Sequence, residues 1–357
     1  MRHLFSWLLS KFRKPPEVAD DADQTSPPAP RIHVVILDGT QSNLIPGHET
    51  NAGLALLLTQ EMIGSDFNVI YRPGIQFSTE TFTSMFNVLI GRGLNKQICD
   101  AYGALASKFR AGDQVYLLGF SRGAFAVRSL AGIIDRVGLL RSEHATHRQV
   151  MRAFRHYKRN PDGDVAQSFS DKYCHDYVCI KAIGVWDTVK ALGIRLPFIW
   201  RAFDGRHKFH NHQIAGCVES GFHALALDET RVAFTPVMWE TRADWPGHLK
   251  QMWFRGNHGD VGGHLGGRPA TRPLSNIPFV WMMTQLGGAG LPLPKGWEDR
   301  FPMDHRAPSW GNWTGGQKFF LLREPRVVGG DPSESLHPTV NPRNHDALRG
   351  LHDASGR

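Results

Sequence analysis

The sequence has few cysteines and no long apolar run. Four cysteines in 357 residues, Cys99, Cys174, Cys179 and Cys217, are too sparse for a disulfide scaffold, and no two of them form a C-x-x-C pair. We therefore expect buried free thiols in a chain made for a reducing compartment. No stretch of about eighteen or more apolar residues is present, so we expect no transmembrane span.

Acidic residues are outnumbered by basic ones. The chain has 33 Asp and Glu against 41 Lys and Arg, a formal net charge of +8. Such an excess favours anionic partners, but net charge alone does not separate nucleic acid from an anionic membrane surface. Basic and aromatic residues are not interleaved in any recognisable nucleic-acid module, so we expect no nucleic-acid partner.

Residues 1–30 differ in composition from the rest. "MRHLFSWLLSKFRKPP" would form a short amphipathic helix, and "EVADDADQTSPPAP" is an acidic, proline-containing stretch without periodicity. We interpret residues 1–30 as an amphipathic segment, either a frayed terminus or a weak membrane-surface contact, followed by a disordered linker. No small-residue cleavage site follows the apolar part, so a secretory signal is not expected. The catalytic domain is expected over 31–345.

From residue 31 on, short apolar runs alternate with longer amphipathic segments. This alternation predicts an α/β fold with a mostly parallel central sheet and helices on both faces. "LNKQICDAYGALASKF" carries apolar residues at helical spacing and is the clearest helix. A last strand is expected near "KFFLL". The other strand candidates are 33–40, 68–74, 114–120, 178–187 and 251–260.

"LLGFSRGAF" places Ser121 between an apolar strand and a helix rich in small residues. A strand, a sharp turn and a helix in this order are typical of a nucleophile elbow, in which glycines flank the serine because side chains there would collide with the backbone. Gly119 and Gly123 occupy these flanking positions. We therefore expect Ser121 to be a nucleophile.

A serine nucleophile needs a base and an acid that orients the base. The α/β-hydrolase order is serine, acid, histidine, and the sequence supplies it. Asp187 ends the apolar run of "IGVWDTV", and His258 lies in the glycine-rich "FRGNHGDVGG". We expect these two residues to complete a triad with Ser121.

Other residues compete for both roles. His264 and His337 are alternative bases, and His337 lies in a late loop that could reach the serine. Asp228, at an expected helix end, and Asp260, which follows the histidine and could brace its loop, are alternative acids. A strand-terminal aspartate is also commonly a turn or helix cap.

The oxyanion hole should combine the N–H of Arg122 with an N–H from the loop after an earlier strand. "LDGTQSN" supplies that loop, in which Gly39 or Thr40 could present its amide beside Ser121. Asp38 would then brace the loop rather than take part in the chemistry.

Together these residues resemble a known family, the α/β-hydrolase catalytic domain of type VI secretion phospholipase effectors and its bacterial relatives. The resemblance rests on "ILDGTQSN", "LLGFSRGAF", "GVWDTV", "FHALALDETRVAFTPVMWE" and "MWFRGNHGDVGGH", in that order, and spans roughly residues 31 to 285. It implies a Ser121-Asp187-His258 triad that hydrolyses an ester, in the effectors a phospholipid acyl ester. It implies no cofactor and no metal.

The segment after Asp187, "KALGIRLPFIWRAFDGRHKFHNH", mixes bulky apolar and basic residues. We interpret residues 190–215 as a cap in which 190–208 either contacts anionic lipid or packs as a buried helix with a basic outer face. The expected partner is a lipid or other ester substrate, while the sequence identifies no immunity or secretion partner. We expect synthesis in a bacterial cytoplasm, followed by export through a dedicated secretion system or association with a membrane.

Two other classes of function remain open at this point. Asp38, Asp187, His258, Asp260 and His264 could gather at one sheet edge as the ligands of a metal-dependent phosphoesterase. The chain could also be a non-catalytic binding module on a hydrolase scaffold, because a fold does not by itself imply a function.

Overall fold

The structure is a computed structural model of the chain, and it describes residues 29–40, 42, 44–74, 92–189, 212–311 and 321–341. Almost all of the expected N-terminal segment, most of the expected cap and the "KFF" of the expected last strand lie outside these residues. None of the described helices is both long and apolar enough to cross a membrane.

A seven-stranded sheet forms the centre of the domain. Its order is β2-β1-β3-β4-β5-β6-β7, and every neighbouring pair is parallel. Since parallel strands run in one direction, their carboxyl ends meet at one edge, where loop residues from distant parts of the sequence come together. The strands are β1 (Ile32–Leu37), β2 (Phe67–Arg72), β3 (Gln114–Phe120), β4 (Ile180–Trp186), β5 (Ser220–Ala226), β6 (His248–Phe254) and β7 (Glu334–Leu336).

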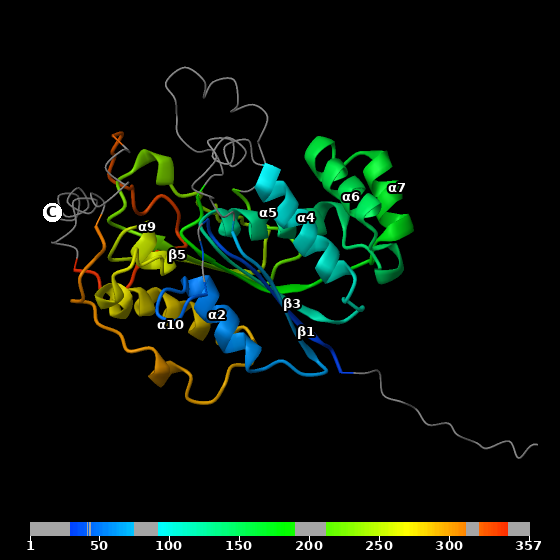
Figure 1. Cartoon of the computed structure of the whole chain (residues 1–357). Coiled ribbons are helices and arrows are strands. Elements are labelled where there is room, and N and C mark those ends of the chain that lie inside the picture. The colour runs from blue at the N-terminus through cyan, green and yellow to red at the C-terminus, as the bar shows by residue number, and fades with distance from the viewer. Residues whose placement is uncertain are drawn as a thin grey trace, which may run out of the picture.

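Helices cover both faces of this sheet (Figure 1). On one face lie α4 (Arg92–Ala106) and α5 (Arg122–Val137), with α6 (His147–Arg159) and α7 (Asp164–Tyr173) outside them. On the other face lie α2 (Asn51–Gln60) and α10 (Arg272–Gly288), and the short α9 (His258–Gly262) follows β6. Single 3-10 turns span Ser142–His144, Val232–Phe234, Pro269–Thr271 and Glu298–Arg300.

The alternation of side chains along β1 explains why two helical layers are needed. Val35 and Leu37 are buried in the cluster that includes α4 and α5, whereas Val34 and Ile36 are buried in the cluster that includes α2 and α10. A central parallel strand is apolar on both sides, so each face must be covered. The predicted α/β-hydrolase-like fold, with helices on both faces of a parallel sheet, is confirmed.

The observed strands differ from the predicted ones at three places. β5 was not predicted, because "SGFHALA" consists mostly of small residues of mixed polarity and carries no clear strand signal. The last strand is β7 at Glu334–Leu336, whereas Leu321 and Leu322 of "KFFLL" lie in irregular structure. The strand predicted over 251–260 ends at Phe254, and α9 begins at His258.

Candidate active site

Ser121 occupies a sharp turn between β3 and α5. Its φ of 58° and ψ of −119° are common only for glycine and cost a residue with a Cβ about 1–3 kcal/mol. A Cβ on Gly119 would lie 2.6 Å from the carbonyl oxygen of Gly123, and a Cβ on Gly123 would lie 2.0 Å from the carbonyl oxygen of Leu37. The turn therefore tolerates only glycine on either side of Ser121.

His258 begins α9 and faces Ser121. Its Nε2 lies 2.9 Å from the Ser121 Oγ. The rings of Phe120 and Phe234 flank the imidazole, each with its centroid 4.9 Å away. The backbone N–H of His258 donates to Oε2 of Glu229 at 3.2 Å. The ring and the main chain at this position are thus both held in place.

Asp187 follows the last residue of β4 and has a positive φ of 40°. Its Oδ2 lies 2.6 Å from Nδ1 of His258, and its Oδ1 accepts the N–H of Ala226 at 3.0 Å. Arg326 donates to both oxygens, at 2.5 and 2.9 Å. Asp187 is fully buried, and its two oxygens accept four hydrogen bonds.

Burial and charge act in opposite directions on the pKa of Asp187. Burial alone raises it, but the Arg326 guanidinium and the hydrogen bond from His258 outweigh burial and hold the pKa well below its ordinary value. Burial lowers the pKa of His258 below 6.5, although Asp187 opposes this. At neutral pH, Asp187 is therefore ionised and the imidazole is neutral. With Nδ1–H donated to Asp187, the Nε2 lone pair is directed at Ser121.

Sequence reasoning missed three charged residues around this site, Arg326, Glu229 and Arg231. Glu229 pairs with Arg231 at 2.6 Å, and the Arg231 guanidinium lies 3.9 Å from the centre of the Phe234 ring. Arg326 lies 139 positions from Asp187, so no local spacing could reveal the pair. Glu229 and Arg231 fall within the block "LDETRVAF", where the only signal is their proximity in sequence.

Two of the expected oxyanion-hole residues, Arg122 and Gly39, lie next to Ser121. Arg122 is the first residue of α5, and its N–H is one of the donors that a helix leaves without a partner of its own. Gly39 packs on Ser121, because a Cβ built on it would lie 3.3 Å from the serine Cβ. The N–H of Gly39 already donates to Oδ1 of Asp38 at 2.6 Å. The role of the Thr40 amide as the second donor stays a prediction.

Asp38 holds the loop that follows β1. Its carboxylate accepts hydrogen bonds from the Thr50 hydroxyl at 2.7 Å and the Tyr71 hydroxyl at 2.9 Å, besides the N–H of Gly39. Burial raises the pKa of Asp38 to about 6, and these hydrogen bonds oppose the rise. The carboxylate thus ties the loop to the start of α2 and to β2.

The two alternative bases make other contacts. His337 stacks on Phe254, with centroids 4.8 Å apart, and its Nδ1 lies 2.8 Å from the Thr339 hydroxyl. His264 packs edge-on against Trp310, with centroids 5.7 Å apart. Within the described part of the chain, neither imidazole has a hydrogen bond to the proposed nucleophile.

The two alternative acids hold turns. Oδ2 of Asp228 accepts the N–H of Gly256 at 2.7 Å, so Asp228 lies in the turn after β5 and not at a helix end as expected. Asp260 accepts the N–H of Asn257 at 2.9 Å and the hydroxyl of Ser309 at 2.5 Å. Asn257 in turn accepts the N–H of Asp260, which forms a capping box at the start of α9.

The residues considered for a metal-dependent phosphoesterase do not form a ligand set. In the ranges that the structure describes, no group of three or more His, Cys, Asp or Glu side chains could hold a metal ion. The carboxylates of Asp38, Asp187 and Asp260 each accept hydrogen bonds from a different set of protein donors.

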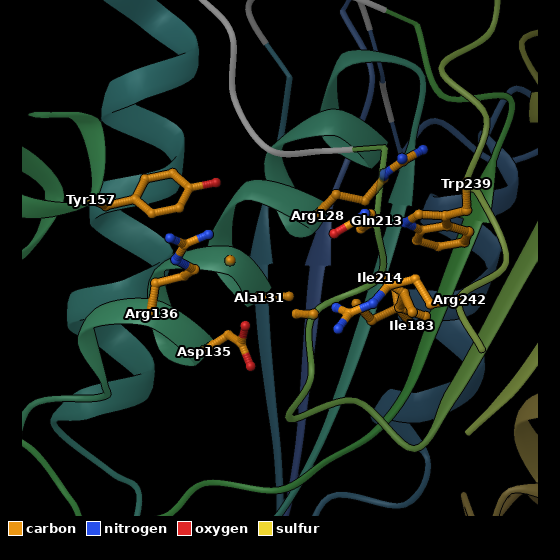
Figure 2. A pocket seen from close by; sticks show the side chains of 12 residues that line it. Arg128, Ala131, Asp135, Arg136, Tyr157, Ile183, Gln213, Ile214, Trp239 and Arg242 are labelled. Atoms are coloured by element: carbon orange, nitrogen blue, oxygen red, sulfur yellow. The ribbon is translucent and has the colours of Figure 1, made fainter. Parts of the chain in front are cut away.

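A small hollow of about 60 Å³ lies beside α5, with Tyr157 of α6 on one side and residues 213–215, Trp239 and Arg242 on the other (Figure 2). Three arginines line it, but Arg136 pairs with Asp162, Arg242 pairs with Asp244, and Arg128 donates to backbone carbonyls. Ser121, His258 and Asp187 are not among its lining residues. The hollow is therefore not the site of the chemistry.

The chain is similar to several known proteins. It is 28% identical over 264 residues to an uncharacterized protein of Saccharomyces cerevisiae, YEL023C. The matched region covers 65% of this chain and 37% of the yeast protein. An uncharacterized protein from Pseudomonas aeruginosa matches with 17% identity and a TM-score of 0.43, over 77% of this chain and 49% of that one. The Tle1 effector bound to the VgrG spike from the type 6 secretion system matches with 18% identity and a TM-score of 0.39, over 68% and 53%.

This chain spans little more than a third of the yeast protein and about half of each of these two solved chains. Residues 31–285, most of the chain, match a family described as T6SS, phospholipase effector Tle1-like, catalytic domain. These residues contain the Ser121 turn, Asp187 and His258, whereas Arg326 lies beyond them. The chain belongs to the family of Tle1-like phospholipase effector catalytic domains.

Proposed function

We propose that this chain is a serine hydrolase that cleaves an acyl ester of a phospholipid through a triad of Ser121, His258 and Asp187. The observation that carries the proposal is the line of two hydrogen bonds from the Ser121 Oγ through the imidazole to the Asp187 carboxylate. Nucleophile, base and orienting acid are in contact in the order that acyl transfer needs.

The reaction follows from this geometry. Nε2 of His258 takes the hydroxyl proton as the Ser121 Oγ attacks the ester carbonyl carbon. The N–H groups of Arg122 and Thr40 stabilise the oxyanion that forms. When the intermediate collapses, the imidazolium gives its proton to the departing alcohol and leaves an acyl-serine. Water, deprotonated by the same imidazole, then releases the fatty acid. Asp187 stays ionised and stabilises the imidazolium.

Two surface features support a lipid substrate with an anionic group. Among the described residues, none pairs with the Arg122 guanidinium, which is partly buried next to the nucleophile. A phosphate is the ligand that such a cation suits. Leu321 and Leu322 are exposed by 79% and 61%, and apolar side chains of this size on a surface are suited to contact with lipid.

Covalent labelling with a fluorophosphonate probe tests the nucleophile without assuming a substrate. We expect the probe to modify Ser121 in the wild-type protein and not to modify the Ser121→Ala variant. Ser129→Ala is the matched control, because Ser129 is also a buried serine, but it lies inside α5 and donates to the carbonyl of Phe125. That variant should label like the wild type. Peptide mapping identifies the modified residue.

Release of fatty acid from phospholipid vesicles then tests the substrate. The wild-type protein and Ser129→Ala should release it, and Ser121→Ala should not. Full activity in Ser121→Ala, abolished by a chelator, would refute the serine mechanism and favour a metal-dependent one. Labelling of Ser121 with activity only on soluble short-chain esters would keep the mechanism and refute the phospholipid substrate.

A further inference from the structure

Residues 321–328, here called the strap, follow residue 285, at which the family match ends. The strap runs along the segment that follows β5. The N–H of Val232 donates to the carbonyl of Leu322 at 3.1 Å, and the N–H of Glu324 donates to the carbonyl of Thr230 at 2.7 Å. The strap is thus fixed by backbone hydrogen bonds to the loop that carries Phe234 and Glu229.

Arg326 extends from the strap into the interior. Its side chain is only 4% exposed, and it forms two parallel hydrogen bonds to the Asp187 carboxylate. The same guanidinium donates to the carbonyls of Ala226 and Phe234, both at 2.7 Å. One side chain therefore joins the acid of the proposed triad to the end of β5 and to the backbone of Phe234, whose ring flanks the imidazole.

Arg326 supplies a positive charge to the buried Asp187 carboxylate as well as hydrogen bonds. Asp187 is fully buried, and an ionised carboxylate without a cation is unstable in a protein interior. The imidazole of His258 is neutral in the resting site and cannot supply that cation. Arg326 is the only cation with a hydrogen bond to Asp187 among the residues described. Its planar fork fits both carboxylate oxygens at once, which a lysine cannot do.

We propose that Arg326 is a positioning residue of the active site, which keeps Asp187 ionised and oriented toward His258, and that the strap is therefore part of the catalytic unit. The inference rests on the proposed triad function. It means that residues 31–285, which define the family match, do not by themselves form a complete site in this chain. The acid of the triad depends on a residue that lies after them.

Loss of the Arg326 charge should shift the pH dependence of the reaction at Ser121 toward higher pH. The reactive form needs a neutral imidazole and an ionised Asp187. Without the guanidinium, the pKa of Asp187 rises, and the pKa of His258 rises as well because its carboxylate partner is no longer shared with a second cation. Both changes move the acid limb, the low-pH side of the rate profile on which the rate falls as these groups are protonated, to higher pH.

Other titratable groups also face this pair. Glu229 raises the pKa of His258 and Arg231 lowers it. His264 and His223 interact electrostatically with His258 and Asp187 respectively. All four groups are present in wild type and variant, but Arg326 lowers the pKa of His223 and of Glu229, in addition to the larger effect of burial on each. Substitution of Arg326 therefore also removes its effect on these two groups.

The experiment measures the rate constant of fluorophosphonate labelling from pH 4.5 to 9 in full-length protein. Arg326→Gln removes the charge, and Arg326→Lys keeps the charge but not the fork. Arg128→Gln is the matched control. Arg128 is also buried, donates to the carbonyls of Val237 and Met238, and lies over Trp239 (Figure 2), but has no hydrogen bond to Asp187. Thermal unfolding is recorded for every variant.

We expect Arg326→Gln to label about 10²- to 10⁴-fold more slowly at pH 7, with its acid limb about one pH unit or more higher. Arg326→Lys should also label slowly, with an acid limb near that of the wild type. Arg128→Gln should lose stability while its folded fraction keeps the wild-type limb. This contrast separates a positioning role from a purely structural one.

The inference is overturned if folded Arg326→Gln has the labelling rate and acid limb of the wild type, or if it loses stability alone, as the Arg128 control does. If Arg326→Gln does not fold, Arg326→Lys decides, and a wild-type labelling rate in that variant overturns the inference. Absence of labelling in the wild-type protein is a different result, because it refutes the proposed function itself.

Discussion

The strained backbone of Ser121 predicts that glycine stabilises this position more than alanine does. Ser121→Ala and Ser121→Gly both remove the Oγ and its hydrogen bond to His258, so that loss cancels when the two variants are compared. They differ in the Cβ, which disfavours a φ of 58° with a ψ of −119°. Only the glycine variant relieves this strain.

Two opposing contributions set the difference in stability between the two variants. Relief of the strain stabilises the glycine variant by about 1–3 kcal/mol. The greater freedom of glycine in the unfolded chain costs about 0.4–1 kcal/mol. The net difference in the free energy of unfolding should therefore be about 0–2.6 kcal/mol in favour of Ser121→Gly, with a midpoint of about 1.3 kcal/mol. At Ser129, inside α5, the order should be the reverse, because glycine in a helix interior is about 1 kcal/mol worse than alanine.

Urea unfolding at pH 7 measures all four variants, with fluorophosphonate labelling as the check that both substitutions at 121 abolish reactivity. Of these two unreactive variants at 121, the glycine variant should be the more stable one. If Ser121→Gly is less stable than Ser121→Ala, by the same amount as the pair at 129, the reasoning about strain is wrong.

Three further predictions concern the charges and the surface. Asp187→Asn should lower the labelling rate constant about 10⁴-fold at pH 7, because an amide does not hold the imidazole in the reactive tautomer, and wild-type labelling would refute its role as the acid. Arg122→Gln and Leu322→Ser should each reduce fatty-acid release from anionic vesicles and leave labelling unchanged; equal losses in both assays would point to damage of the fold instead. The free energy of unfolding should fall as the pH drops below about 6.5, by up to about 1.4 kcal/mol per pH unit for each buried neutral histidine. Burial lowers the pKa of His223 to about 3, so between these two pH values this histidine is protonated only in the unfolded chain. Urea unfolding at pH 7 and pH 5 measures this loss, and His223→Gln should reduce it; an unchanged pH slope in that variant would contradict the assignment.

Much of the fold could be predicted because its signals are local. Apolar runs such as "HVVIL" and "VYLLGF" became β1 and β3, and the periodic segment from Leu94 became α4. β5 was missed because its alanines, glycine and histidine are not residues that favour strands. It is a strand because β4 and β6 on either side supply its hydrogen bonds, and these are tertiary contacts.

For the site, the sequence by itself determined the Ser121 turn. Two glycines, an apolar strand before them and a helix of small residues after them are all local, and the backbone strain follows from these few residues. The sequence also limited the acid and the base to a short set of candidates at strand ends.

Only the tertiary structure shows which of those candidates are in hydrogen-bond contact with one another. His258 contacts Ser121 and Asp187 contacts His258, while Asp228 and Asp260 hold turns and His337 stacks on a neighbouring ring. It also brought Arg326, 139 positions away in the sequence, to the buried carboxylate. The physical reason is that contacts between residues scores of positions apart depend on how the chain closes around the sheet edge, and no periodicity in the sequence records that closure.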